Sequence, residues 1–321
     1  MLHLSAAQCD ALQAGPDPAE LDAAHAWLAQ PGNSLMTLAD TDYPPALLEI
    51  ADPPAVLYCK GRRALLRQPA LGIVGSRNAT PQGVRDAEAF AHALSDAGLT
   101  IVSGLALGID AAAHRGGLAG AGASIAVIGT GLDRIYPARN KALAHALAET
   151  GLIVSEFPLG TAPLPGHFPR RNRLISGLSR GVLVVEAAPG SGSLITARVA
   201  TEQGRDVFAI PGSIHSPLAR GCHALIKQGA KLVESAADVL DELAWLRPLS
   251  PPEPGGDKGR AASRDTATDA VLNALENAPI TLDTLVQRTG LTLEALSAKL
   301  LALELDGQIA SLPGGRYQKI H

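Results

Sequence analysis

Residues 181–197 read GVLVVEAAPGSGSLITA, and this stretch decides the fold. An unbroken run of small and apolar residues is followed by Pro, Gly and Ser, after which the pattern becomes that of a helix. A strand that is apolar on both faces is typical of a parallel sheet covered by helices on both sides. The stretch therefore predicts one β-strand, a tight turn and a helix that packs back on the sheet.

The same pattern recurs throughout residues 66–245. Further strands are predicted at LGIVG (71–75), TIVSG (100–104), SIAVIG (124–129), LIVSE (152–156) and DVFAI (206–210), and helices at Gln82–Ala97, Gly108–Gly120, Arg139–Glu149 and Ser193–Gln203. Repeated strand–helix units indicate the α/β class. We expect an extended Rossmann-like, doubly wound and mostly parallel sheet.

The segments on either side of this domain have a different character. Residues 1–65 are rich in Ala and Leu and predict a short helical N-terminal segment with a proline-rich lead-in. Residues 246–268 are rich in Pro, Gly, Ser and charge, which is typical of a flexible linker. Residues 269–321 predict three helices and a hairpin with a Gly-Gly tip, the parts of a winged helix-turn-helix domain.

Composition narrows the classes of function. The chain has 321 residues, a net charge of −4 and only 3% aromatic residues, so nucleic-acid binding would need a local basic patch. No apolar run is long enough to span a membrane, and the start lacks the pattern of a secretory signal. The three cysteines are far apart in the sequence, which favours a reducing, cytoplasmic location over disulfides or a zinc site.

Small and polar residues follow nearly every predicted strand. Open parallel sheets bind ligands at the carboxyl ends of their strands, where glycines allow close approach and helix N-termini favour phosphate. A strand–glycine turn is also often only a turn. The candidate binding residues in these turns are Gly75, Ser76, Arg77, Gly104, Ser191, Gly192, Ser193 and Thr196.

A basic stretch, FPRRNR (168–173), lies in another of these connections. Together with Arg77 and Lys141 it would place several cations on one rim, and we expect them to form one trough for a polyanionic strand. Arg170 and Arg173 are candidate phosphate ligands, and Asn172 would orient an arginine or contact the sugar-phosphate chain. Phe168 is either a ring for base stacking or an ordinary core residue. Leu174, Ile175 and Leu178 are expected to be the buried face of the same helix.

Three other polar residues have plainer interpretations. Asp110 is expected to be a local hydrogen-bond partner, and His114 a packed or capping histidine rather than a base. Glu186, at the end of its strand, is expected to bind a backbone group. None of these residues is predicted to be catalytic.

Six ordered motifs resemble the DNA-processing protein A family, also called DprA or Smf. They are GIVGSRNATPQG, VSGLALGIDAAAHRGGL, GTGLDRIYPARNKAL, SEFPLGTAPLPGHFPRRNRLISGLSRGVLVVEA, SGSLITARVATEQGRDVFAIPG and GCHALIKQGAKLV, and they span residues 38–245 almost without a gap. The tail resembles the winged-helix domain of many members. The first thirty residues are shorter than the helical N-terminal domain that the resemblance implies.

The resemblance implies a non-enzymatic protein of the bacterial cytoplasm, without a cofactor, that binds single-stranded DNA as a homodimer. It would protect strands taken up in natural transformation and help load the recombinase RecA. The implied DNA-binding residues are Arg77, Lys141 and the FPRRNR segment. A lysine that relatives carry shortly before this segment is absent here, where residues 164–167 read LPGH.

Two other functions compete with this one. The segment VVEAAPGSGSLITA distantly resembles the PGGxGTxxE loop of nucleotide phosphoribohydrolases, but the position of the required carboxylate falls near Ala197, so the general acid or base is missing. A pure interaction scaffold with an incidental basic rim is the other alternative. A dehydrogenase is disfavoured because GIVGSRNATPQG is not GxGxxG.

Two predictions concern protein contacts. The winged-helix module from residue 269 onward holds more acids than bases, so a protein-interaction or regulatory role is favoured over reading a DNA groove. Leu225 and Ile226 are either core residues or part of a dimer interface.

Overall fold

The computed structural model describes residues 17–244 and residues 5, 9, 13 and 15, and, in the C-terminal region, residues 275, 280–289, 291–292, 296, 299–300, 303–304, 309–312 and 316–319. The chain divides into two compact units, Met1–Leu249 and Ser250–His321.

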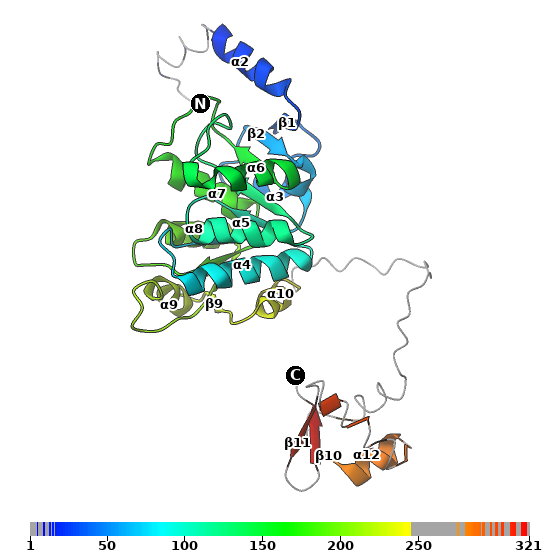
Figure 1. The fold of residues 1–321 in the computed structure, drawn as a ribbon. Helices are drawn as coiled ribbons and strands as arrows, with labels where there is room; N and C mark the ends of the chain where they lie inside the picture. Colours follow the sequence, from blue (N-terminus) through cyan, green and yellow to red (C-terminus); the bar gives the residue numbers. More distant parts are fainter. Residues whose placement is uncertain are drawn as a thin grey trace, which may run out of the picture. The chain divides into compact units, whose positions relative to one another are not determined.

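The first unit is built on a nine-stranded sheet of order β1-β2-β6-β5-β4-β3-β7-β8-β9 (Figure 1). The strands are β1 (Asn33–Thr37), β2 (Val56–Gly61), β3 (Ala70–Gly75), β4 (Thr100–Ser103), β5 (Ser124–Val127), β6 (Leu152–Ser155), β7 (Gly181–Val185), β8 (Asp206–Ala209) and β9 (Lys231–Leu232). Pairing is parallel from β6 through to β9, whereas β2 runs antiparallel to both β6 and β1. The mostly parallel α/β fold expected from the sequence is therefore confirmed.

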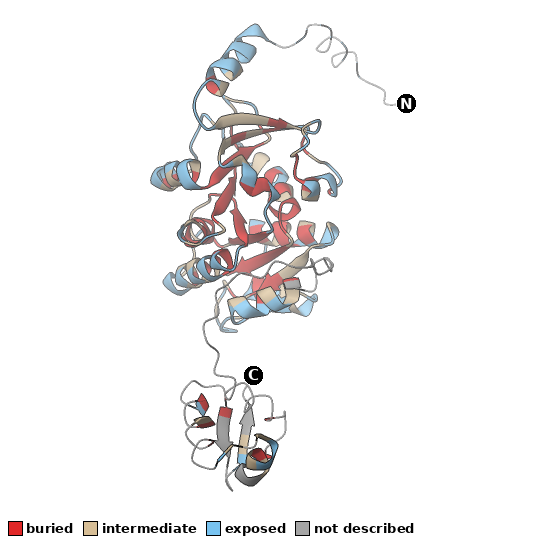
Figure 2. Cartoon of the chain, turned by 90° about the vertical axis from the view of Figure 1, so that its right-hand side faces the viewer, coloured by how far each residue is buried: buried red, intermediate tan, exposed pale blue. Residues whose placement is uncertain are grey.

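Helices cover both faces of this sheet (Figures 1 and 2). One face carries α4 (Pro81–Asp96), α5 (Ile109–Ala119), α6 (Lys141–Thr150) and α10 (Ala236–Ala244). The other carries α3 (Pro45–Leu48), η1 (Arg63–Arg67), α7 (His167–Gly177), α8 (Gly192–Glu202) and α9 (Arg220–Lys227). The remaining elements of this unit are α2 (Pro18–Leu28) and η2 (Ala138–Asn140).

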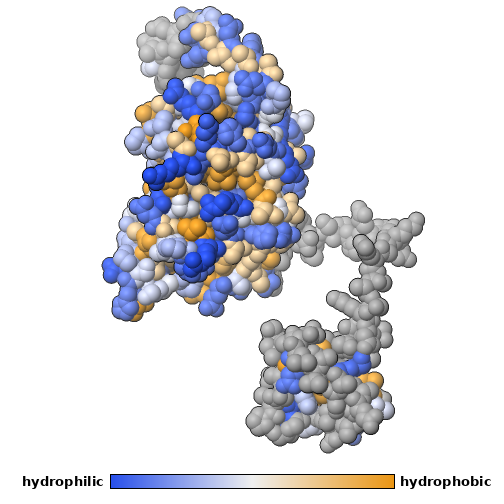
Figure 3. All heavy atoms as spheres, viewed as in Figure 1, coloured by the Kyte–Doolittle hydropathy of each residue, from blue (hydrophilic) through white to orange (hydrophobic). Residues whose placement is uncertain are grey.

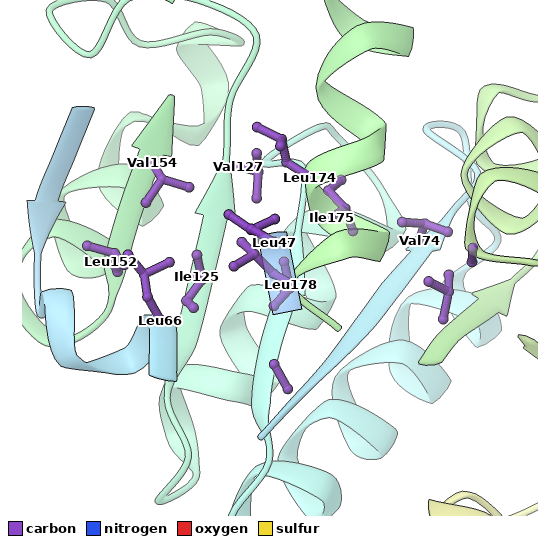
Figure 4. Close-up of a cluster of buried hydrophobic side chains, with 14 of the residues drawn as sticks. Leu47, Leu66, Val74, Ile125, Val127, Leu152, Val154, Leu174, Ile175 and Leu178 are labelled. Atoms are coloured by element: carbon purple, nitrogen blue, oxygen red, sulfur yellow. The ribbon is translucent and has the colours of Figure 1, made fainter. Parts of the chain in front are cut away.

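Alternation along the strands builds a separate core on each face. In β7, Val182 and Val184 pack toward α7 and α8, while Leu183 and Val185 pack toward α4 and α5. Figure 4 shows the first of these cores, in which Leu174, Ile175 and Leu178 are buried, as the sequence predicted. Truncating one such leucine to alanine typically costs about 2–5 kcal/mol, so this core holds α7 firmly on the sheet.

The N-terminal segment differs from its prediction. Residues 1–65 were expected to be helical with a lead-in, but the described part also contains β1 and β2, which extend the sheet beyond β6. Their sequences, NSLMT and VLYCKG, are short and only half-buried, so periodicity gives little signal. β2 is ordered by pairing with β6, a strand far along the chain.

Hydrophilic and hydrophobic residues are interspersed over the face of the first unit that Figure 3 shows. Within the described part of the chain, no helix has both the length and the apolar character needed to cross a membrane.

The second unit contains a three-stranded sheet of order β10-β12-β11. Its elements are β10 (Ile280–Thr281), α12 (Leu282–Thr289), β11 (Ile309–Leu312) and β12 (Arg316–Lys319). β11 and β12 form the predicted hairpin, and Leu285, Leu296 and Ile309 belong to a small core of this unit. The predicted linker 246–268 and nearly all of the predicted first helix lie outside the described residues.

Candidate nucleic-acid interface

A pocket of about 660 Å³ opens at the carboxyl ends of β3 and β7, between the loop after β3, the start of α7 and the start of α8. Of the predicted site residues, it is lined by Gly75, Ser76, Arg77, Phe168, Asn172, Ser191, Gly192, Ser193 and Thr196. Segments far apart in the sequence thus meet where an open α/β sheet binds its ligands.

The loop that carries Arg77 is anchored from below by Glu186. This residue has a φ of 52° at the end of β7, and its carboxylate accepts hydrogen bonds from the Thr80 backbone N–H (2.8 Å) and the Thr80 hydroxyl. Thr80 in turn caps α4 by accepting a hydrogen bond from the Gly83 N–H. The expected backbone partner of Glu186 is thereby confirmed, and Glu186 holds the Arg77 loop against the sheet.

Arg77 is exposed on the rim of the pocket. Its guanidinium lies 5.6 Å from the centroid of the Phe168 ring, and it forms no ion pair with any carboxylate that the structure describes. A guanidinium held over an aromatic ring keeps its N–H donors free for an anion. Phe168 itself is half-buried and lines the pocket.

The N-terminus of α8 forms the opposite polar wall. Ser191 is the N-cap residue, and its hydroxyl accepts from the Ser193 N–H at 3.3 Å. The Asn172 side-chain amide donates to the Gly192 carbonyl at 3.5 Å, so α7 and α8 are linked across the pocket. Free N–H groups and the helix dipole at such an end favour a phosphate.

Arg171, which was predicted only as one cation of the FPRRNR segment, lines the pocket and forms its floor. Only 4% of it is exposed, and its Nη1 donates to the Val127 carbonyl at 2.7 Å, while its buried Nε has no hydrogen-bond partner. Burial lowers the pKa of Arg171 to about 10, partly offset by the nearby Asp110 carboxylate. A buried arginine is visible in the sequence only as one more cation, so the pattern could not single it out.

Gly104 and Asp110 lie next to the Arg171 side chain. Burial raises the pKa of Asp110, and the carboxylate accepts hydrogen bonds from the N–H groups of Gly104 (3.1 Å) and Ala106 (3.3 Å), as expected of a local partner. A Cβ atom on Gly104 would lie 1.9 Å from Nη1 of Arg171. Gly104 is buried and does not line the pocket, and its DNA contact stays a prediction.

Arg173 does not reach the pocket, and the expectation that it joins a single trough is wrong. Its Nη2 lies 2.7 Å from Oε2 of Glu156, a carboxylate whose side chain is only 5% exposed, and its Nε lies 3.2 Å from Asp52. Arg170 also faces Glu156, at 3.5 Å, and its guanidinium lies over the Phe157 ring. Both arginines contact carboxylates from other parts of the chain, so the FPRRNR motif alone could not reveal these ion pairs.

Lys141 is exposed at the first residue of α6 and does not line the pocket. It follows Asn140, whose side-chain amide donates to the carbonyls of Leu105 (2.9 Å) and Ala106 (3.1 Å). Lys141 forms no ion pair with a described carboxylate. It is thus a cation near the same edge of the sheet rather than a pocket residue.

His114 is packed inside, as expected. Its Nε2 accepts from the Leu105 N–H at 3.2 Å, and its Nδ1 lies 2.8 Å from the Ser124 hydroxyl, which itself donates to the Ile101 carbonyl. Burial, reinforced by the charge of Arg171, lowers the pKa of His114 to about 3. Among the described residues there is also no cluster of His, Cys, Asp and Glu suited to a metal ion.

The fold and pocket agree with comparisons to known proteins. The sequence model of DNA recombination-mediator protein A matches residues 34–244. The chain belongs to this family. The DprA winged helix domain matches residues 255–315, in agreement with the hairpin and helix of the second unit.

The family relatives cover most of the chain. Protein Smf of Escherichia coli is 44% identical over 292 residues, which cover 90% of this chain and 78% of the relative. The DNA processing protein DprA of Streptococcus pneumoniae is 51% identical over 209 residues, covering 65% of this chain and 74% of the relative.

Two solved structures of this family are also similar. The X-ray structure of DprA from Streptococcus pneumoniae has a TM-score of 0.66 at 48% identity and covers 71% of this chain and 78% of that chain. A structure of DNA processing protein A from Helicobacter pylori, described for its single-stranded DNA binding mode, has a TM-score of 0.61 at 32% identity and covers 67% of this chain and 98% of that chain.

Proposed function

We propose that this protein binds single-stranded DNA in the pocket at the carboxyl ends of β3 and β7. The observation that carries the proposal is that Arg77, without a carboxylate partner, faces a pocket that also contains a helix N-terminus. The binding mode described for the Helicobacter pylori relative supports it. Proteins that hold single strands combine a cationic groove with a few rings for stacking, which matches this pocket.

In this mechanism the backbone of the strand supplies the anions. Arg77 binds a phosphate through its fork of N–H donors, and the N–H groups and hydroxyls at Ser191–Ser193 bind a second oxygen or the next phosphate. Arg171 supplies a buried positive charge beneath them. Phosphate contacts of this kind carry no base sequence, so binding is expected to be independent of sequence.

The proposal extends to the biological role. The protein would protect strands taken up in natural transformation, help load RecA onto them, and act in the cytoplasm as a homodimer. For the dimer, a second pocket of about 580 Å³ between α8 and α9 is lined by Leu194 and Leu225. Leu225 and Ile226 are only partly buried, so their apolar surface is available to a second copy.

The enzyme alternative finds no added support in the described residues. Ala197, where a phosphoribohydrolase would need its carboxylate, is fully buried against the sheet. The nearby Glu186 is engaged with Thr80, and the His114 side chain is held neutral in the interior. We therefore propose a binding protein rather than a catalyst.

Fluorescence anisotropy with labelled oligo-dT tests the proposed function. We expect tight, salt-sensitive binding and weaker binding of a duplex. Arg77→Ala removes charge-assisted hydrogen bonds and should weaken binding about 10- to 100-fold. It should also make the slope of log affinity against log salt less steep by about 0.7, the value for one phosphate contact on a single strand.

Arg85→Ala is the matched control, because Arg85 is an exposed arginine on α4 that does not line the pocket. It should bind oligo-dT like the wild type. Absence of oligonucleotide binding by the wild type at low salt would favour the scaffold alternative. Release of free base from a nucleoside monophosphate would favour the hydrolase.

A further inference from the structure

The pocket has an apolar wall opposite its polar one. This wall is formed by Tyr136 from the loop before η2, Pro163 and Pro165 from the loop before α7, and Phe168 and Pro169 from the first turn of α7. Apart from the Tyr136 hydroxyl, none of these side chains carries a hydrogen-bond donor for a phosphate. The wall therefore suits a ligand group of a different chemistry from the one that Arg77 and the α8 N-terminus would bind.

The two rings of the wall differ in how much surface they offer. Phe168 is half-buried: Arg77 lies over its ring, and a Cβ atom on Gly129 would lie 3.3 Å from the ring edge. Tyr136 lies 5.8 Å from Phe168, centroid to centroid, with an interplanar angle of 36°. Tyr136 is 49% exposed, so most of the free aromatic surface of the wall belongs to it.

An exposed ring is unusual in this protein. Aromatic residues make up only 3% of the chain. Among the residues that the structure describes, Tyr136 is the one aromatic side chain in the set of exposed large hydrophobic residues. Leaving a large ring in water at the mouth of a pocket forgoes the stabilisation that its burial would provide, which points to a ligand that covers it.

We infer that Tyr136 stacks on a base of the bound single strand, next to the phosphate that Arg77 holds. The inference rests on the proposed function and deepens it by assigning a base subsite to the apolar wall. Arg77, Phe168 and Tyr136 form a continuous series of contacts, in which the guanidinium faces the backbone and the exposed ring faces the base. Stacking on a ring tolerates any base, so it adds affinity without sequence preference.

Loss of a stacked base should lower the affinity for DNA without changing its salt dependence, whereas loss of a phosphate contact should change both. A base stacked on an aromatic side chain contributes about 1–3 kcal/mol, so Tyr136→Ala should weaken oligo-dT binding about 5- to 100-fold. The slope of log affinity against log salt should stay that of the wild type, because no phosphate contact is removed. Tyr136→Phe keeps the ring and should bind like the wild type.

The decisive comparison uses a strand of the same length built entirely of abasic sites. The wild type should bind this strand more weakly than oligo-dT, and Tyr136→Ala should bind it as well as the wild type does. Leu38→Ala is the control for loss of exposed apolar surface, since Leu38 is 45% exposed and does not line the pocket. It should change binding of neither strand.

Other outcomes would overturn the inference. Equal losses for Tyr136→Ala on both strands would mean that Tyr136 only supports Phe168 and Arg77, and wild-type affinity for oligo-dT would mean that no base contacts it. A wild type that binds neither strand would instead refute the proposed function. The two failures are thus distinguished in one set of titrations.

Discussion

Arg171 and Arg173 lie on the same helix, α7, yet they meet different surroundings. Arg171 is buried beneath the pocket beside Asp110, with its Nη1 on the Val127 carbonyl. Arg173 turns away from the pocket to Glu156 and Asp52, and thereby ties α7 to the end of β6 and to the lead-in segment. The difference shows that a cluster of cations in a sequence contributes to an anion site only where the fold does not direct its side chains to carboxylates away from that site.

The electrostatic contacts of Arg173 and of Arg171 also differ in how much they are expected to stabilise the fold. The contact of Arg173 with Asp52 is 72% exposed on the carboxylate side, and exposed ion pairs contribute about 0–1 kcal/mol. The contact with Glu156 is nearly buried. Losing it would leave the Glu156 carboxylate, which is shielded from water, without this ion pair. On the Arg171 side both charges are buried. We therefore expect a substitution at the pocket floor around Arg171 to lower the free energy of unfolding more than a substitution of Arg173.

The largest expected effect is that of Asp110→Ala. It would leave the N–H groups of Gly104 and Ala106 without their acceptor and Arg171 without its nearby negative charge. Two buried N–H groups without an acceptor and a buried cation without a compensating charge nearby are together expected to cost about 3–5 kcal/mol. Urea unfolding followed by circular dichroism should show this loss in the free energy of unfolding.

Asp22→Ala, at an exposed position on α2, is the control and should change the free energy of unfolding by less than about 0.5 kcal/mol. A stability of Asp110→Ala equal to that of the control would show that the pocket floor does not depend on this carboxylate.

Arg173→Ala should have an intermediate effect on stability and a small one on the salt dependence of binding. Glu156 would keep only its longer contact with Arg170, and the free energy of unfolding is expected to fall by about 2–3 kcal/mol. The slope of log affinity for oligo-dT against log salt should remain that of the wild type, in contrast to Arg77→Ala, which should alter the slope and leave the stability nearly unchanged.

The opposite result would contradict this contrast between Arg171 and Arg173. In that case Arg173→Ala would unfold with the wild-type free energy, but the slope of its log affinity against log salt would be less steep by the value of one phosphate contact. That result would mean that DNA displaces Glu156 and draws Arg173 into the interface.

The effect that is smallest at neutral pH is that of His114, which packs near Arg171 and contributes only as the pH falls. His114 has its pKa lowered from 6.5 to about 3, so the folded protein excludes a proton that the unfolded chain takes up. Stability is therefore lost as the pH falls from about 6.5 toward 3, by about 1.4 kcal/mol per pH unit for this one group. The difference in unfolding free energy between the wild type and His114→Asn should show this slope.

Above pH 6.5 the same difference should be constant, because His114 is then neutral in both the folded and the unfolded states. A constant difference between pH 6.5 and 4 as well would show that His114 takes up its proton in the folded protein, contrary to its buried position.

Much of the architecture was predictable because it is local. Apolar runs such as GVLVV at 181–185 and the small-residue turns after them specify strand, turn and helix within a few residues. Because open parallel sheets bind ligands at the carboxyl ends of their strands, Arg77, Ser191 and Thr196 were predicted at that edge of the sheet, and the pocket is found there. The short strands β1 and β2 were not predicted, since β2 is ordered by pairing with the distant strand β6 and β1 by pairing with β2.

The order of residues specified the parallel α/β fold, the edge of the sheet that carries the pocket and nine of the residues that line it, because strand alternation and turn chemistry act over short distances. Tertiary structure alone decided which cations remain available. Glu156 and Asp52 pair with Arg173 and Asp110 lies beside Arg171, whereas Arg77 lies over the Phe168 ring and forms no ion pair with a carboxylate in the described part of the chain. Charge interactions depend on distance and burial in space, and neither quantity is written in the order of residues along the chain.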